Sequence, residues 1–237
     1  MKENYLGVDV CTFNYEQIST SILNDIENDK KSFIVAINPE KIMKARKDKE
    51  LLTLLNNADY QIPDGIGVVV ASKLKGGKIK ERVTGIDLMM HLCKVCESNG
   101  KSIFLYGGKP GVAETAKDKL IKDFPSIRIV GVIDGYEQDQ EYIKEKINNA
   151  NPDIIFVALG SPKQENWILE NMNTSSPSIY QGVGGSFDVI AGNIDRAPEF
   201  LQKFGLEWFY RLLKEPWRWK RQILLPKFLI AVLTSRN

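Results

Sequence analysis

Residues 102–111 of this 237-residue chain read SIFLYGGKPG, and this stretch decides the fold. A short apolar run, Ser102–Tyr106, ends at glycines 107, 108 and 111, and an amphipathic segment, Val112–Phe124, follows it. A buried strand, a glycine turn and a helix in this order form one unit of a parallel α/β sheet.

The same unit returns along the chain. Apolar runs at 33–37, 128–133, 154–159 and 179–183 each end at a turn that contains glycine or proline. Helical patterns are predicted over 66–74, 86–96, 112–124, 141–149 and 165–172. The predicted fold is therefore α/β, with a Rossmann-like parallel sheet sandwiched by helices. In such folds ligands bind beyond the carboxyl ends of the strands.

Composition places the chain among globular proteins, with 43% hydrophobic and 26% charged residues. Three cysteines cannot form a disulfide framework, so a reducing compartment is expected. Met1–Val10 lacks the pattern of a secretory signal, and no apolar run approaches the roughly 20 residues of a spanning helix. We therefore expect a cytoplasmic protein that does not span a membrane.

The net charge of +2 is the sum of a basic C-terminal segment and an acidic remainder. Residues 199–237 hold eight Lys or Arg, three Glu and three of the four tryptophans, which leaves residues 1–198 with a net negative charge. We place a boundary near Pro198, between a catalytic domain (1–197) and a basic, aromatic, helical appendage (198–237) with breaks near Pro216 and Pro226. Basic and aromatic residues together indicate association with an anionic membrane surface. The alternative is a helix whose aromatic residues pack on the body; nucleic acid fits less well.

Two strand ends carry candidate chemistry. The loop Gly107-Gly108-Lys109-Pro110-Gly111 could bind phosphate through backbone N–H groups, or could simply be a tight turn. Asp64, in Pro63-Asp64-Gly65, could act as a general base, or could cap the following helix.

Three further segments also have two interpretations. Arg82, before the capping residue Thr84, could hold a phosphate or lie on the surface. A predicted helix start is surrounded by the polar side chains of Ser161-Pro162-Lys163-Gln164-Glu165, which could line a site. The alternative is that Ser161 only caps the helix, with Pro162 as its first residue. Gly184-Gly185-Ser186-Phe187-Asp188 offers N–H donors and a carboxylate for a ribose or base, or a helix-capping Asp.

Other motifs do not indicate a site. Cys93 and Cys96 match C-x-x-C but fall on the apolar stripe of a predicted helix, which favours a structural role. His91, the one histidine, falls in the middle of the same helix, which argues against a Ser–His–Asp triad. The sequence contains no D-x-D pair to hold Mg²⁺ or Mn²⁺ on a nucleotide diphosphate.

Together these motifs resemble one family over nearly the whole chain. They are Asn38-Pro39-Glu40, the segment 63–68, Glu81-Arg82-Val83-Thr84-Gly85, the segment 104–113, Gly160–Glu165, Gly184–Asp188, Arg196-Ala197-Pro198 and Gly205-Leu206-Glu207-Trp208. The chain is similar to the WecG/TagA/CpsF glycosyltransferases (family 26), and most similar to members that make the linkage unit of wall teichoic acid.

The resemblance implies an inverting, metal-independent transfer without a cofactor. N-acetylmannosamine would pass from UDP-ManNAc to the 4-hydroxyl of GlcNAc on undecaprenyl diphosphate, at the inner face of the cell membrane. Asp64 would be the catalytic base. The leaving UDP would be stabilised by Arg82, by Gly107, Gly108 and Lys109, and by Arg211, Arg218 and Arg221 of the appendage. Asn38 and Gln164 would line the sugar site, and Tyr136 and Asp188 would contact uridine.

One departure from the family pattern concerns the donor. Ala36 stands two positions before Asn38, where many members carry Thr. UDP-ManNAcA or UDP-glucose therefore remain alternative donors in surface polysaccharide synthesis. A non-catalytic nucleotide- or NAD-binding module and a membrane adaptor are the alternatives of another class. The oligomeric state, a homo-oligomer included, is left open.

Overall fold

The computed structural model describes residues 1–198, 200–201, 206–214, 219 and 223–235. Its main sheet consists of β3 (Ser32–Ile37), β4 (Tyr60–Pro63), β5 (Ser102–Gly107), β6 (Arg128–Ile133), β7 (Ile154–Ala158) and β8 (Ile179–Gly182). A separate antiparallel hairpin joins β1 (Lys2–Tyr5) to β2 (Val8–Cys11).

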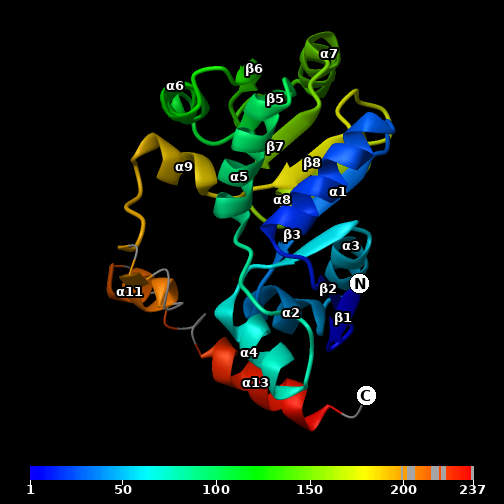
Figure 1. Cartoon of the computed structure of the whole chain (residues 1–237), viewed down its shortest axis with the longest axis vertical. Coiled ribbons are helices and arrows are strands. Elements are labelled where there is room, and N and C mark those ends of the chain that lie inside the picture. The colour runs from blue at the N-terminus through cyan, green and yellow to red at the C-terminus, as the bar shows by residue number, and fades with distance from the viewer. Residues whose placement is uncertain (199, 202–205, 215–218, 220–222, 236–237) are drawn as a thin grey trace.

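Helices connect the strands. They are α1 (Tyr15–Glu27), α2 (Pro39–Ala45), α3 (Lys49–Asn56), α4 (Ile66–Leu74), α5 (Gly85–Ser98), α6 (Val112–Asp123), α7 (Gln140–Ala150), α8 (Lys163–Asn171), α9 (Ser186–Ala191), α11 (Glu207–Lys214) and α13 (Leu224–Thr234). The main sheet has the order β4-β3-β8-β7-β5-β6, and every pair of neighbours is parallel. The predicted fold class, a parallel sheet between helices, is confirmed (Figure 1).

Alternating side chains of the strands build one hydrophobic core on each face of the sheet. Phe33, Val35 and Ile37 of β3 point into the core that contains residues of α2, α3, α4, α7, α8 and α13. Ile34 points the other way, into the core shared with α1, α5, α6 and α9. This period of two within a fully apolar run is typical of a strand buried on both faces.

The chain reverses its direction of travel across the sheet between β5 and β7. After β5 it passes through α6 to the edge strand β6, whereas after β7 it passes through α8 to β8 on the other side. Such a switch point opens a crevice beyond the carboxyl ends of the two strands. The glycine loop 107–111 follows β5 and Gly160 follows β7, so both lie at this crevice.

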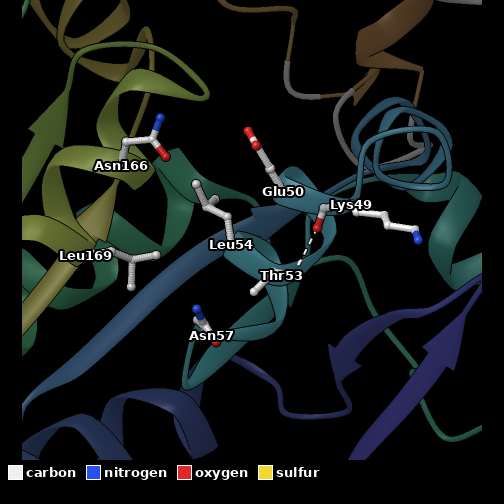
Figure 2. Close-up of a pocket in the computed structure, with 7 residues that line it drawn as sticks. All are labelled: Lys49, Glu50, Thr53, Leu54, Asn57, Asn166 and Leu169. Carbon is white, nitrogen blue, oxygen red and sulfur yellow. Dashed lines mark hydrogen bonds between the residues drawn. The ribbon is translucent and has the colours of Figure 1, made fainter.

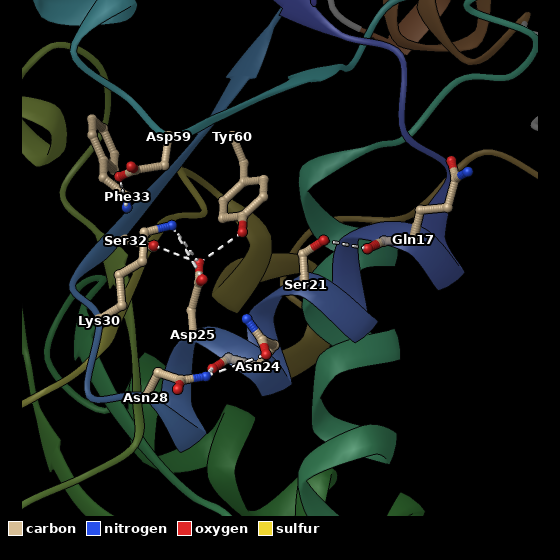
Figure 3. Close-up of polar contacts among 10 residues, drawn as sticks. All are labelled: Gln17, Ser21, Asn24, Asp25, Asn28, Lys30, Ser32, Phe33, Asp59 and Tyr60. Atoms are coloured by element: carbon tan, nitrogen blue, oxygen red, sulfur yellow. Dashed lines mark hydrogen bonds and ion pairs between the residues drawn. The ribbon is translucent and has the colours of Figure 1, made fainter. Parts of the chain in front are cut away.

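At the opposite edge of the sheet, Asp25 ties the amino ends of two strands to α1 (Figure 3). Its Oδ2 accepts hydrogen bonds from Ser32 Oγ at 2.6 Å and from Tyr60 Oη at 2.7 Å, and Lys30 Nζ lies 3.1 Å from Oδ1. Burial alone would raise the pKa of Asp25, but these hydrogen bonds outweigh it and lower the pKa. We assign this network to the stability of the fold.

The C-terminal helix α13 packs against α2 and α4. Gly67 in α4 makes this possible, because a Cβ there would clash with Leu225 and Pro39. The break predicted near Pro226 corresponds to the start of α13. Pro226 lies in the first turn of this helix, where a backbone N–H has no partner within the helix and proline is tolerated. Within the described ranges, no helix combines the length and apolarity needed to cross a bilayer.

Candidate active site

Asp64 stands directly after β4, at the carboxyl end of the sheet. Its backbone N–H donates to the carbonyl of Ile37 at 2.8 Å, which joins it to the end of the neighbouring strand β3. The residue is half-buried, and Gly65, not Asp64, is the N-cap of α4. The alternative in which Asp64 is the N-cap of the helix is therefore wrong.

Asn38 lies beside this turn. Its Oδ1 accepts the N–H of Lys41 at 2.9 Å, so Asn38 caps α2 and keeps its Nδ2 group outside the cap. The turn at Gly65 packs closely on it, because a Cβ at Gly65 would lie 3.3 Å from Cβ of Asn38 and 2.8 Å from Cδ of Pro39. The predicted sugar-site residue Asn38 and the predicted base Asp64 thus follow adjacent strands.

Arg82 is brought to the same edge by its neighbours. The N–H of Val83 donates to the carbonyl of Pro63 at 2.9 Å, one residue before Asp64. The Arg82 guanidinium lies 3.2 Å from the carboxylate of Glu207 in α11, and its side chain is 17% exposed. The interpretation of Arg82 as an exposed surface residue is therefore wrong.

The segment that carries Arg82 is anchored on both sides. Thr84 caps α5 as predicted, since its Oγ1 accepts the N–H of Asp87 at 3.1 Å. The N–H of Thr84 donates to the hydroxyl of Tyr15 at 2.9 Å. Burial raises the pKa of Tyr15, and the carboxylates of Asp87 and Asp64 raise it further. Tyr15 therefore stays a neutral phenol that can fix this backbone beside Asp64.

The glycine loop after β5 is tightly packed. Gly107 has φ +121°, and a Cβ there would lie 2.5 Å from the backbone of Ala158 in β7. The N–H of Gly108 donates to the carbonyl of Ala158 at 2.9 Å, while Lys109 is exposed. Gly111, with φ +81°, is the N-cap of α6. The tight turn is confirmed. Phosphate binding stays a prediction, and the position of the loop at the N-terminus of α6 favours it.

Tyr136 and Asp188 were expected at uridine. Tyr136, after β6, is 64% exposed. Asp188 lies in the first turn of α9, whose N-cap is Gly185, so its interpretation as the capping residue is wrong. Tyr136 follows the edge strand β6, whereas Asp188 follows β8 in a helix that packs against α6. A contact of either residue with a nucleotide stays a prediction.

Gln164 is almost completely buried at the start of α8. Its Oε1 accepts the N–H of Gly184 at 3.0 Å, and its Nε2 donates to Glu165 Oε1 at 3.2 Å. Ser161 is not the cap of this helix: the N-cap is Pro162, and Lys163 is the first helical residue. Gln164 therefore joins the ends of β7 and β8.

The arginines of the appendage are only partly covered by the structure. Arg211 belongs to α11, but its side chain is not described, and Arg218 and Arg221 lie outside the described residues. Their predicted role at the leaving UDP stays a prediction.

Cys93, Cys96 and His91 all lie within α5, away from the strand ends. Both cysteines are fully buried, and burial raises the pKa of Cys96 to about 12, so their structural interpretation is confirmed. In the described part of the chain, no three His, Cys, Asp or Glu side chains group closely enough to hold a metal ion. Metal independence stays a prediction.

A pocket on the surface does not coincide with this edge (Figure 2). It lies between α3 and α8 and is lined by Lys49, Glu50, Thr53, Leu54, Asn57, Asn166 and Leu169. None of these seven residues follows a strand end, and none is a predicted site residue. The candidate active site is therefore the carboxyl edge of the sheet, where Asp64, Asn38, Arg82 and Gln164 follow or adjoin strand ends.

A parallel sheet with glycine loops, a carboxylate and a guanidinium at its carboxyl edge is the arrangement of Rossmann-like enzymes that bind nucleotides. The sequence profile of the glycosyl transferase WecG/TagA/CpsF family matches residues 3–237. The chain belongs to this family.

Two relatives carry the same name, N-acetylglucosaminyldiphosphoundecaprenol N-acetyl-beta-D-mannosaminyltransferase. The protein from Bacillus subtilis (strain 168) is 41% identical over 204 residues, which cover 86% of this chain and 80% of the relative. The protein from Bacillus spizizenii (strain ATCC 23059 / NRRL B-14472 / W23) is also 41% identical, over 208 residues that cover 88% and 81%.

Sequence reasoning missed three residues around this site. Lys41 forms an ion pair with Glu165 at 2.8 Å, Glu207 pairs with Arg82, and Tyr15 holds Thr84. The two ion pairs join residues more than 120 positions apart in the chain, so no local pattern could have indicated them.

Proposed function

We propose that the chain is an inverting glycosyltransferase that moves N-acetylmannosamine from UDP-ManNAc to the 4-hydroxyl of GlcNAc on undecaprenyl diphosphate. The product is a β-1,4 disaccharide lipid, the linkage unit of wall teichoic acid. The observation that supports this most directly is the position of Asp64, a half-buried residue at a strand end and next to the Arg82 segment. The names of the two relatives support the same reaction.

The reaction assigns each group a role. Asp64 accepts the proton of the acceptor 4-hydroxyl as its oxygen attacks the anomeric carbon. The bond from that carbon to the diphosphate oxygen breaks, configuration inverts, and UDP leaves as an anion. Arg82 and the 107–111 loop, with Lys109, stabilise the charge that develops on the diphosphate. Cations and N–H donors can supply this stabilisation without a metal.

The sugar and uridine sites follow from the same edge. Asn38, at the end of the neighbouring strand β3, and Gln164, which joins the ends of β7 and β8, are assigned to the sugar. Tyr136 and Asp188 are assigned to uridine. Ala36 is the half-buried residue of β3 and packs near Gly85, so position 36 borders the donor site and bears on donor choice.

The acceptor is anchored in a membrane, which gives the basic C-terminal segment a role. We propose that residues 198–237 dock on the anionic inner leaflet, and that Arg211, Arg218 and Arg221 then add to the diphosphate site. Sedimentation with vesicles that contain phosphatidylglycerol tests this proposal. Binding that persists after truncation at residue 197 would reject it.

Turnover of a GlcNAc-diphospho-lipid against a panel of UDP-sugars, with and without EDTA, tests the function. We expect UDP-ManNAc to be used and EDTA to have no effect. Use of UDP-ManNAcA or UDP-glucose alone would assign a different donor within the family. No turnover with any UDP-sugar, together with binding of NAD, would favour a non-catalytic nucleotide-binding module.

A further inference from the structure

A buried polar cluster lies behind the sugar-site residue Gln164. Nζ of Lys41, from α2, lies 2.8 Å from Oε1 of Glu165, and Nε2 of Gln164 donates to the same oxygen at 3.2 Å. On its other side, Oε1 of Gln164 accepts the N–H of Gly184 at 3.0 Å. We call Lys41, Gln164, Glu165 and the N–H of Gly184 the Glu165 cluster.

The cluster determines which way the Gln164 amide points. A carboxylate that faces a lysine can only accept, so Glu165 requires the NH₂ end of Gln164. A backbone N–H can only donate, so Gly184 requires the oxygen end. Gly182 packs closely against the same amide, because a Cβ at this position would lie 2.5 Å from Nε2 of Gln164. Contacts on both sides therefore favour one orientation and leave one N–H of Nε2 for a ligand.

Glu165 is difficult to explain as a purely stabilising residue. It is fully buried, and its Oε2 has no hydrogen-bond partner, whereas buried carboxylate oxygens are normally satisfied. A buried ion pair often adds nothing to stability compared with apolar residues of similar size. Since Oε2 is also inaccessible to solvent, Glu165 cannot touch a substrate, and its influence on the site must pass through Gln164.

We propose that Glu165, held by Lys41, is a positioning residue that fixes the Gln164 amide with an N–H directed at the bound donor sugar. This inference rests on the proposed function, which places Gln164 at the sugar. Replacing the carboxylate by an amide removes the acceptor-only partner on one side, so that Gly184 alone orients the Gln164 amide and its N–H is held less firmly toward the sugar.

A double-mutant cycle with Gln164 tests the coupling. Glu165→Gln is expected to lower kcat/KM for the UDP-sugar about tenfold, but to have little further effect in a Gln164→Ala background. An equal loss in both backgrounds would show that Glu165 acts on the fold and would overturn the proposal. Binding of UDP alone, which lacks the sugar, is expected to be unchanged in Glu165→Gln.

Stability needs its own control, because Glu165→Gln leaves the Lys41 ammonium without its carboxylate. The double variant Lys41→Met/Glu165→Gln removes both charges and is expected to regain the thermal stability of the unsubstituted protein. Its activity is expected to stay low, since the acceptor-only carboxylate is still missing. Recovery of activity together with stability would overturn the positioning role.

A readout without turnover separates this inference from the proposed function. In protein labelled with ¹⁵N, the Gly184 amide proton and the Gln164 side-chain protons are expected to change chemical shift in Glu165→Gln. Unchanged shifts with an active enzyme would overturn the positioning role alone. Shifts that change as expected in a protein that uses no UDP-sugar would support the positioning role and overturn the proposed function.

Discussion

Nη2 of Arg82, in the loop before α5, lies 3.2 Å from Oε2 of Glu207, the first residue of α11. Both side chains are largely buried, at 17% and 10% exposed. The pair connects the C-terminal segment to the loop that adjoins Asp64. It also holds the guanidinium that we assign to the leaving diphosphate.

This ion pair predicts that Glu207→Gln loosens α11. Loss of a largely buried pair is expected to cost about 1–2 kcal/mol, which makes hydrogen exchange over 207–214 roughly five- to thirtyfold faster. Exchange measured by mass spectrometry checks this. Asp195→Asn is the matched control, because its pair with Lys214 is exposed and spans 3.6 Å. Equal acceleration in both variants would contradict a specific role for the Arg82 pair.

The turn after β5 predicts a severe effect of Gly107→Ala. A φ of +121° is unfavourable for alanine, and its Cβ would meet the backbone of Ala158. We expect a loss of about 2–5 kcal/mol in the free energy of unfolding, measured with denaturant. Gly185→Ala, at the end of β8, is the control: its φ is −81° and its Cβ would meet no atom within 4 Å. A mild effect at Gly107 would contradict the close approach of β5 and β7.

The Asp25 network predicts a pH-dependent contribution to stability. Asp25→Asn is expected to lower the free energy of unfolding by about 1–3 kcal/mol at pH 7. The folded-state pKa of Asp25 lies below its ordinary value of 3.8, so the stabilisation is complete above that value and disappears as the pH falls through the lower, folded value. Denaturation of both proteins between pH 7 and pH 3 measures this. A difference that does not shrink with acid, or one equalled by the exposed Asp118→Asn, would contradict it.

The cysteines predict a protein with unreactive thiols. All three are buried, and burial raises the pKa of each of them. Because the thiolate is the reactive form, a disulfide reagent at pH 8 is expected to label none of the three until the protein is unfolded. Rapid labelling of Cys93 or Cys96 in the folded protein would contradict this prediction and would favour a redox or metal-binding role for the C-x-x-C motif.

The parallel sheet could be predicted because its strands are continuous apolar runs that end in glycine. The β1–β2 hairpin could not, since Lys2–Tyr5 is a polar segment of four residues whose strand is formed by pairing and by the burial of Tyr5. The exact position of the break near Pro226 could not be predicted either, and the structure places the start of α13 two residues before this proline. A proline predicts the end of a helix in most contexts, but is equally compatible with a first turn.

For the candidate site, too, some features could be predicted from the sequence and others could not. Asp64, Arg82 and Gln164 could be selected because of the family resemblance, and the predicted strand ends beside Asp64 and Gln164 agreed with it, since parallel sheets bind ligands there. Their environments could not be predicted, since the ion pairs Arg82–Glu207 and Lys41–Glu165 join residues that lie far apart in the sequence. At Asp64, the common role of an Asp before a helix would be the N-cap, yet the N-cap here is the next residue, Gly65.

The central claim is that Asp64 is the base of a sugar transfer. Turnover of UDP-ManNAc by Asp64→Asn, measured with a GlcNAc-diphospho-lipid and set beside UDP binding by calorimetry, tests it most directly. Asp48→Asn is the control, because Asn caps α3 as well as Asp does. We expect Asp64→Asn to lose about 10²–10⁴-fold in kcat while UDP binding stays within about twofold, and Asp48→Asn to change neither. Near-normal turnover of Asp64→Asn would contradict the account.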